Sequence, residues 1–113
     1  MSSAISVSLS PGIDEQGNAF FILKIQRHDW EMNIWMTASE LALVPNVRTA
    51  RWDERGSIRL GECAGCPTFW SCKDGNLSIL VGTDAESWDF GVKLPEAIID
   101  EVIAETERQN KTS

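Results

Sequence analysis

The chain has 113 residues, of which 42% are hydrophobic and 24% charged, and its net charge at pH 7 is −7. This length suits a single domain around one hydrophobic core. An acidic chain repels phosphate, so nucleic acid is not an expected partner. The sequence contains no run of about 18–20 apolar residues and no secretion signal, so we expect a cytoplasmic protein that does not enter a membrane.

Alternating apolar residues predict antiparallel strands in the first third of the chain. Apolar residues alternate with serines over 5–10, and Pro11-Gly12 is expected to end this strand. After a polar loop, the β-rich run over 19–26 predicts a second strand that pairs with the first. The alternation returns over 30–36 and predicts a third strand with one apolar face.

A short helix is expected directly after the third strand. Thr37 and Glu40 have the spacing of a capping box, in which each side chain binds the other residue's backbone N–H. This predicts a helix over 38–43, although a strand that continues through these residues is the alternative. Pro45 would end either element, because it has no backbone N–H. Residues 46–55 show little periodicity.

Three further strands are predicted in the second half of the chain, and the last two of them form a hairpin. A weak strand over 57–62 leads into a predicted loop over 61–67, which contains two glycines and a proline. Strands are predicted over 68–72 and 77–81. Between them lies Asp74-Gly75, a dipeptide typical of hairpin turns because glycine tolerates positive φ.

The C-terminal segment predicts one more strand and a long helix. Alternation over 88–94 indicates the strand, and Pro95 suits the first position of the helix. Apolar residues recur over 98–106 at helical spacing, and residues 109–113 are expected to fray. The predicted fold class is therefore α+β, an antiparallel β-sheet of about five to seven strands with a C-terminal amphipathic helix packed on one face, over the last hairpin.

Three cysteines and a single histidine are the candidate metal ligands. Cys63 and Cys66 have the spacing of a zinc clamp, and Cys72 and His28 could complete a site. A redox role for the pair would need a helix N-terminus to stabilise a thiolate, and none is predicted after Cys66. The odd number of cysteines favours reduced thiols that behave as small apolar residues. We therefore expect no bound metal or cofactor.

Candidate catalytic groups are few. His28 beside Asp29 could form a general base with its orienting carboxylate, but adjacent strand residues point to opposite faces, which favours a surface histidine. The four arginines around Trp52 are expected to form local salt bridges, and the alternatives are that they bind an anion or pair with the acidic helix; they are Arg48, Arg51, Arg55 and Arg59. We expect no enzymatic activity.

Negative charge is concentrated in residues 74–107, which hold nine acidic residues and one lysine. Those on the helix could simply keep the protein soluble. Those on the last hairpin are expected to cluster at one end and beside an exposed tryptophan, a combination that suits a basic protein partner. The candidate partner-binding residues are the carboxylates Asp74, Asp84, Glu86 and Asp89 and the aromatic anchors Trp70 and Trp52.

The run from Phe69 to Gly82, followed by Trp88 to Pro95, resembles the C-terminal halves of small bacterial immunity proteins. These are the acidic partners of secreted or contact-dependent toxins, and the resemblance covers about residues 68–107. It implies a non-enzymatic inhibitor that binds a basic cognate toxin, such as a nuclease, and occludes it. The alternatives are a structural or regulatory domain without a toxin partner and a cysteine-based zinc-binding module.

Overall fold

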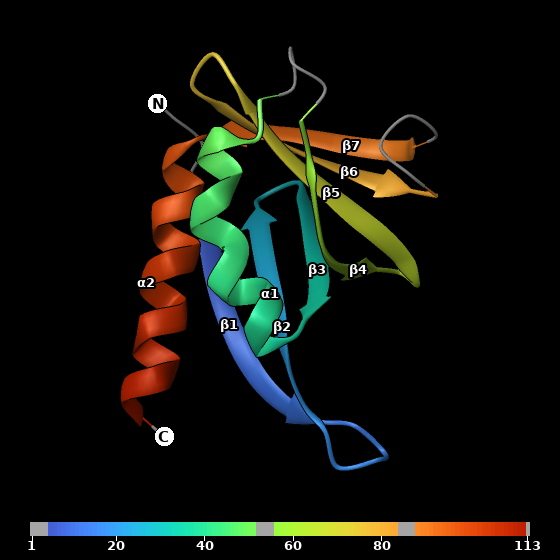
Figure 1. The fold of residues 1–113 in the computed structure, drawn as a ribbon, viewed down its shortest axis with the longest axis vertical. Helices are drawn as coiled ribbons and strands as arrows, with labels where there is room; N and C mark the ends of the chain where they lie inside the picture. Colours follow the sequence, from blue (N-terminus) through green and yellow to red (C-terminus); the bar gives the residue numbers. More distant parts are fainter. Residues whose placement is uncertain (1–4, 52–55, 84–87, 113) are drawn as a thin grey trace.

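The computed structural model describes residues 5–51, 56–83 and 88–112, without the side chains of residues 88, 89, 111 and 112. Within these ranges, seven antiparallel strands form one sheet in sequence order: β1 (Ser6–Ile13), β2 (Ala19–Arg27), β3 (Trp30–Met36), β4 (Ile58–Cys63), β5 (Cys66–Lys73), β6 (Asn76–Gly82) and β7 (Trp88–Pro95). Helix α1 (Ala38–Leu43) and the 3-10 helix η1 (Val44–Thr49) connect β3 to β4, and helix α2 (Ala97–Thr112) follows β7. The predicted α+β class is confirmed (Figure 1).

The sheet changes direction between β3 and β4, so that β1–β3 and β5–β7 run at a large angle to each other (Figure 1). In the described residues, β3 and β4 are joined at one register pair, Trp35 opposite Glu62. Gly61 makes this close approach possible, because a Cβ there would lie 2.6 Å from Ile34 Cγ2 and 2.7 Å from the Trp35 carbonyl oxygen. Its φ of +78° is also one that only glycine adopts without strain.

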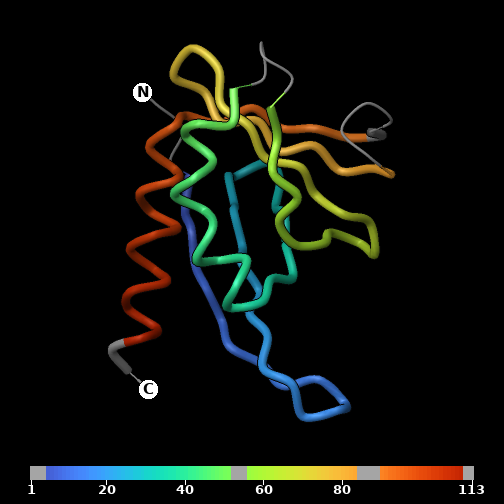
Figure 2. The backbone as a smooth tube through the Cα atoms, in the orientation of Figure 1, coloured from blue at the N-terminus to red at the C-terminus, as the bar shows by residue number. Residues whose placement is uncertain are grey.

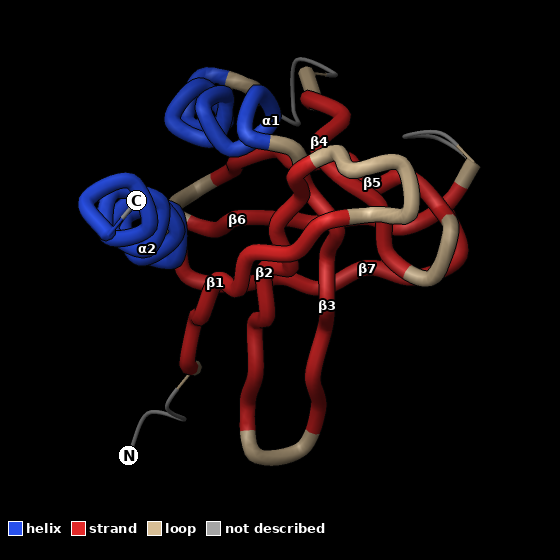
Figure 3. The backbone as a smooth tube through the Cα atoms, turned by 90° about the horizontal axis from the view of Figure 1, so that it is seen from below, coloured by secondary structure: helices blue, strands red, loops and turns tan. Residues whose placement is uncertain are grey.

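Both α helices lie on the same side of the sheet, and the hydrophobic core fills the space between them and the strands (Figure 3). Helix α2 packs mainly against β1 and η1, not over the last hairpin as predicted (Figure 2). The reason is that β1 is an edge strand whose outer carbonyls need partners, and Gln109 Nε2 donates to the Leu9 carbonyl oxygen at 2.9 Å. The helix continues through Gln109 to Thr112, beyond the residue from which fraying was expected.

The capping box predicted at the start of α1 is confirmed and also reaches the sheet. Glu40 Oε1 accepts a hydrogen bond from the Thr37 backbone N–H at 2.8 Å, and Thr37 Oγ1 accepts from the Glu40 N–H at 3.1 Å. Glu40 Oε2 accepts from the backbone N–H of Gly61 at 2.9 Å. One carboxylate thus fixes both the helix and the point where β4 meets β3. Helix α1 ends at Leu43, before Pro45, as predicted. The chain then continues as the 3-10 helix η1, which accepts Pro45 in its first turn because the missing N–H is not needed there.

Three predicted boundaries were wrong. Strand β1 continues through Pro11-Gly12 to Ile13, since an edge strand tolerates proline and the Phe20 ring covers Gly12. The loop predicted over 61–67 is a two-residue turn, Ala64-Gly65, with φ values of 53° and 81°. Pro95 belongs to β7, and α2 begins at Ala97. Among the helices of the described ranges, none has the length and apolar character needed to cross a membrane.

Candidate functional site

Trp70 is not the exposed anchor that the sequence predicted. Its side chain is 0% exposed, and its Nε1–H donates to the Leu60 carbonyl oxygen at 3.2 Å and to Thr68 Oγ1 at 3.0 Å. The Thr68 hydroxyl donates to the same carbonyl. These bonds satisfy the backbone next to Gly61, where the register of β4 shifts. Trp70 is therefore part of the core and supports the β3–β4 junction from inside.

Of the four predicted carboxylates, the structure places the side chain of one. Asp74 is exposed in the turn between β5 and β6, with φ of 52°. It lines an open groove that also contains Lys73 and Lys93, so the charge at this end of the hairpin is mixed. Asp84, Glu86 and Trp52 lie outside the described residues, as does the side chain of Asp89. The expected acidic cluster is thus represented there by Asp74 alone.

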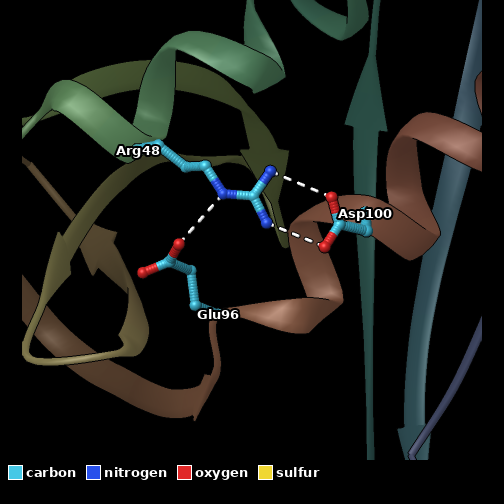
Figure 4. Close-up of polar contacts among 3 residues, drawn as sticks. All are labelled: Arg48, Glu96 and Asp100. Carbon is cyan, nitrogen blue, oxygen red and sulfur yellow. Dashed lines mark hydrogen bonds and ion pairs between the residues drawn. The ribbon is translucent and has the colours of Figure 1, made fainter.

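Arg48 in η1 neutralises part of the acidic face of α2 (Figure 4). Its Nη1 and Nη2 donate to the two oxygens of Asp100 at 2.9 and 2.8 Å, and its Nε donates to Glu96 Oε2 at 2.9 Å. Hydrogen bonding to Arg48 lowers the pKa of Asp100, and Asp100 and then Glu96 raise the pKa of Arg48. Pairing of an arginine with the acidic helix, the alternative to the local salt bridges expected from the sequence, is what the structure shows for Arg48, and it fastens α2 to η1.

Several exposed carboxylates are not neutralised in this way. In the described part of the chain, six exposed acidic residues form no ion pair with another described residue; they are Asp14, Glu15, Glu62, Asp74, Glu101 and Glu107. Arg48 pairs with Glu96 and Asp100, and Arg108 pairs with Glu105. These ion pairs interrupt the acidic face of α2. Some of the carboxylates without an ion pair are isolated, and the others lie near the β3–β4 junction.

An aromatic pair, the exposed Trp35 and the half-buried Phe20, occupies the outer face of the sheet at that junction. The rings of Phe20 in β2 and Trp35 in β3 are stacked, with centroids 4.5 Å apart and planes within 5° of parallel. Trp35 is 51% exposed, which is unusual for so large an apolar group. Sequence reasoning missed this residue, although the alternation of Met32, Ile34 and Met36 toward the core leaves Trp35 on the opposite face.

Two hollows adjoin Trp35, and every charged residue that lines them is acidic. One, of about 580 Å³, is lined by Ile13, Asp14, Glu15, Gln16, Phe20 and Trp35. The other, of about 410 Å³, is lined by Trp35, Glu62, Ala64 and Gly65. Hydrogen bonds from the backbone N–H groups of Asn18 and Gln16 lower the pKa of Asp14, so this carboxylate stays ionised. We call Phe20, Trp35, Glu15 and Glu62 the Trp35 surface.

The cysteines do not assemble into the zinc site that the sequence left open as an alternative. Cys63 and Cys66 face each other across the Ala64-Gly65 turn, whereas Cys72 is buried and donates its backbone N–H to the Ala50 carbonyl oxygen. Among the described residues, no group of three or more His, Cys, Asp or Glu side chains is arranged to hold a metal ion. Burial, and to a smaller extent the neighbouring Cys66, raises the pKa of Cys63, which keeps it a thiol.

His28 is exposed in the turn between β2 and β3, as predicted for a surface histidine. Its neighbour Asp29 binds Arg27 instead, through bonds of 2.9 Å to Nε and 2.9 Å to Nη2. The Arg27 guanidinium carbon also lies 6.0 Å from the ring centre of Trp30. A carboxylate, a guanidinium and an indole therefore combine in this turn.

Comparison of the chain with protein-family models, curated protein sequences and solved structures found no match.

Proposed function

We propose that this protein is a non-enzymatic inhibitor of the immunity type, which binds a basic cognate toxin such as a nuclease and occludes it. The observation that carries this proposal is the Trp35 surface, where the exposed Trp35 stacks on the half-buried Phe20 and the charged residues that line the adjoining hollows are all acidic. Aromatic side chains are the commonest energetic centres of protein interfaces, and surrounding carboxylates select a cationic partner. The resemblance of residues 68–107 to immunity proteins supports the same conclusion.

The net charge and the Trp35 surface have separate roles in this proposal. The net charge of −7 attracts a basic protein over long range and accelerates association. The Trp35 surface would then form the desolvated centre of the complex. Asp74 lies at the far end of β5 from the β4–β5 turn, roughly 20 Å along the strand, so it contributes to attraction rather than to contact.

Growth rescue tests this function. The test takes as candidate toxin any secreted protein whose gene is found next to the gene for this chain, expressed without its export region. We expect co-expression of this protein to restore growth and the purified pair to form a complex that weakens as salt rises. A Trp35→Ala variant should lose rescue, whereas Asp74→Asn should keep it. If the wild-type protein neither restores growth nor binds the toxin at low salt, the proposed function is wrong.

A further inference from the structure

We propose that the hollow between Trp35 and Glu62 is a binding site for a single arginine side chain of the partner protein. This inference rests on the proposed function for the identity of the partner, but the site itself can be tested alone. The hollow is bounded by the indole of β3, the carboxylate of β4 and the Ala64-Gly65 turn. Phe20 lines only the other hollow, so Trp35 presents here the side that Phe20 leaves uncovered.

The chemistry of this hollow suits a guanidinium group. An indole attracts a cation placed over its ring, and a carboxylate accepts hydrogen bonds from a guanidinium in the plane of the group. Glu62 is exposed and has no ion-pair partner among the described residues, so its charge is available. The remaining walls, Ala64 and Gly65, have small side chains that leave the entrance open.

The protein contains the same combination elsewhere, formed by its own residues. In the β2–β3 turn, the Arg27 guanidinium binds both oxygens of Asp29 and lies 6.0 Å from the centre of the Trp30 ring. At the Trp35 surface the indole and the carboxylate are present without an arginine among the described residues. The missing cation is the feature that a basic partner would supply.

Arginine is favoured over lysine for a physical reason. The planar guanidinium can stack on the indole while it donates to Glu62, and it is more weakly hydrated than an ammonium group. Lysine can satisfy the charge but not the stacking. A hollow built from one ring and one carboxylate therefore discriminates between two cations of equal charge.

The junction that forms the hollow is fixed from several sides. Gly61 brings β4 against β3, Glu40 holds the Gly61 N–H, and Trp70 binds the Leu60 carbonyl from within. Trp35 is itself stacked on Phe20. A site whose walls are already ordered loses little conformational entropy when it is occupied.

Titration with triarginine and trilysine peptides, followed by ¹H–¹⁵N NMR, tests the site without the toxin. We expect triarginine to shift the Trp35 indole N–H and the Ala64 and Gly65 amides, and to bind at least about threefold more tightly than trilysine. Glu62→Gln should weaken triarginine binding by about three- to tenfold, and Trp35→Ala by at least about tenfold. Asp74→Asn makes the same change of charge at the far end of β5 and should alter the affinity less than twofold.

Two results would overturn the site. If Asp74→Asn weakens binding as much as Glu62→Gln does, the peptides respond to overall charge only. If triarginine and trilysine bind equally and Trp35→Ala binds like the wild type, the indole has no part. Thermal unfolding of each variant confirms that it is folded. If Trp35→Ala does not fold, the comparison of Glu62→Gln with Asp74→Asn still decides the result.

The outcome for the toxin is independent of the outcome for the peptide. Specific triarginine binding without toxin neutralisation would refute the proposed function and keep the arginine site. Toxin neutralisation by both the wild type and Glu62→Gln, without specific peptide binding, would refute the arginine site and keep the function.

Discussion

Replacing Trp70 by phenylalanine is the sharpest test of how the core supports the Trp35 surface. The change keeps an aromatic ring but removes part of a fully buried side chain and its only hydrogen-bond donor. Complete truncation of a buried tryptophan costs about 3–5 kcal/mol, so loss of part of the ring should cost about 1–2 kcal/mol. Loss of the donor adds about 1 kcal/mol, since the Leu60 carbonyl still accepts from Thr68.

The expected total is about 2–3 kcal/mol, a large share of the stability of a small domain. Urea unfolding followed by far-UV circular dichroism measures it, and with a slope of about 1–3 kcal/mol/M the midpoint should fall by about 0.7–3 M. Trp35→Phe is the matched control and should change the midpoint little, because that indole is half exposed. If both variants unfold at the wild-type midpoint, Trp70 is not part of the core and the description of the junction is wrong.

Three further predictions concern the backbone and the ion pairs. Gly61→Ala should lower the free energy of unfolding by about 2–5 kcal/mol, because its φ is positive and a Cβ there would collide with β3. Gly65→Ala is the control, and it should cost about 1–2 kcal/mol because its φ is 81° but the space around it is open. Equal costs in urea unfolding would contradict the close approach of β4 to β3 at Gly61. Hydrogen bonding to Arg27 lowers the pKa of Asp29 from 3.8 to about 2. The stabilisation from this ion pair is therefore complete above pH 3.8 and is lost as the pH falls toward 2. NMR titration should show this pKa, and Arg27→Gln should return it toward 3.8. Arg48→Gln should lower the Tm, most at low salt, and a Tm unchanged in calorimetry would refute its role in fastening α2.

Much of the local structure could be predicted because its causes are close in the sequence. The capping box of Thr37 and Glu40 fixed α1, and the Asp74-Gly75 dipeptide fixed the β5–β6 turn. Strand β3 was predicted with the correct ends from the alternation of apolar residues alone. Boundaries failed where a distant element mattered, as at Pro11, which is tolerated because β1 is an edge strand covered by Phe20 and α2.

The candidate site could not be predicted in the same way. Alternation separates the two faces of a strand but does not say which face the helices cover, so Trp70 was expected outside although it is buried. Trp35 differs, because alternation places it opposite the apolar face of β3, but its partners Phe20 and Glu62 come from two other strands and could not be foreseen.

By itself, the sequence determined the charge of the protein, its α+β class and most of its helices and strands, because these depend on composition and on neighbouring residues. Only the tertiary structure decided which carboxylates are neutralised and which aromatic rings face the solvent. Arg48 meets Asp100 across 52 positions of the chain, and β4 meets β3 through Gly61 after two helical segments. Such contacts depend on the change of strand direction between β3 and β4 and on the position of α2, and no local sequence pattern specifies either.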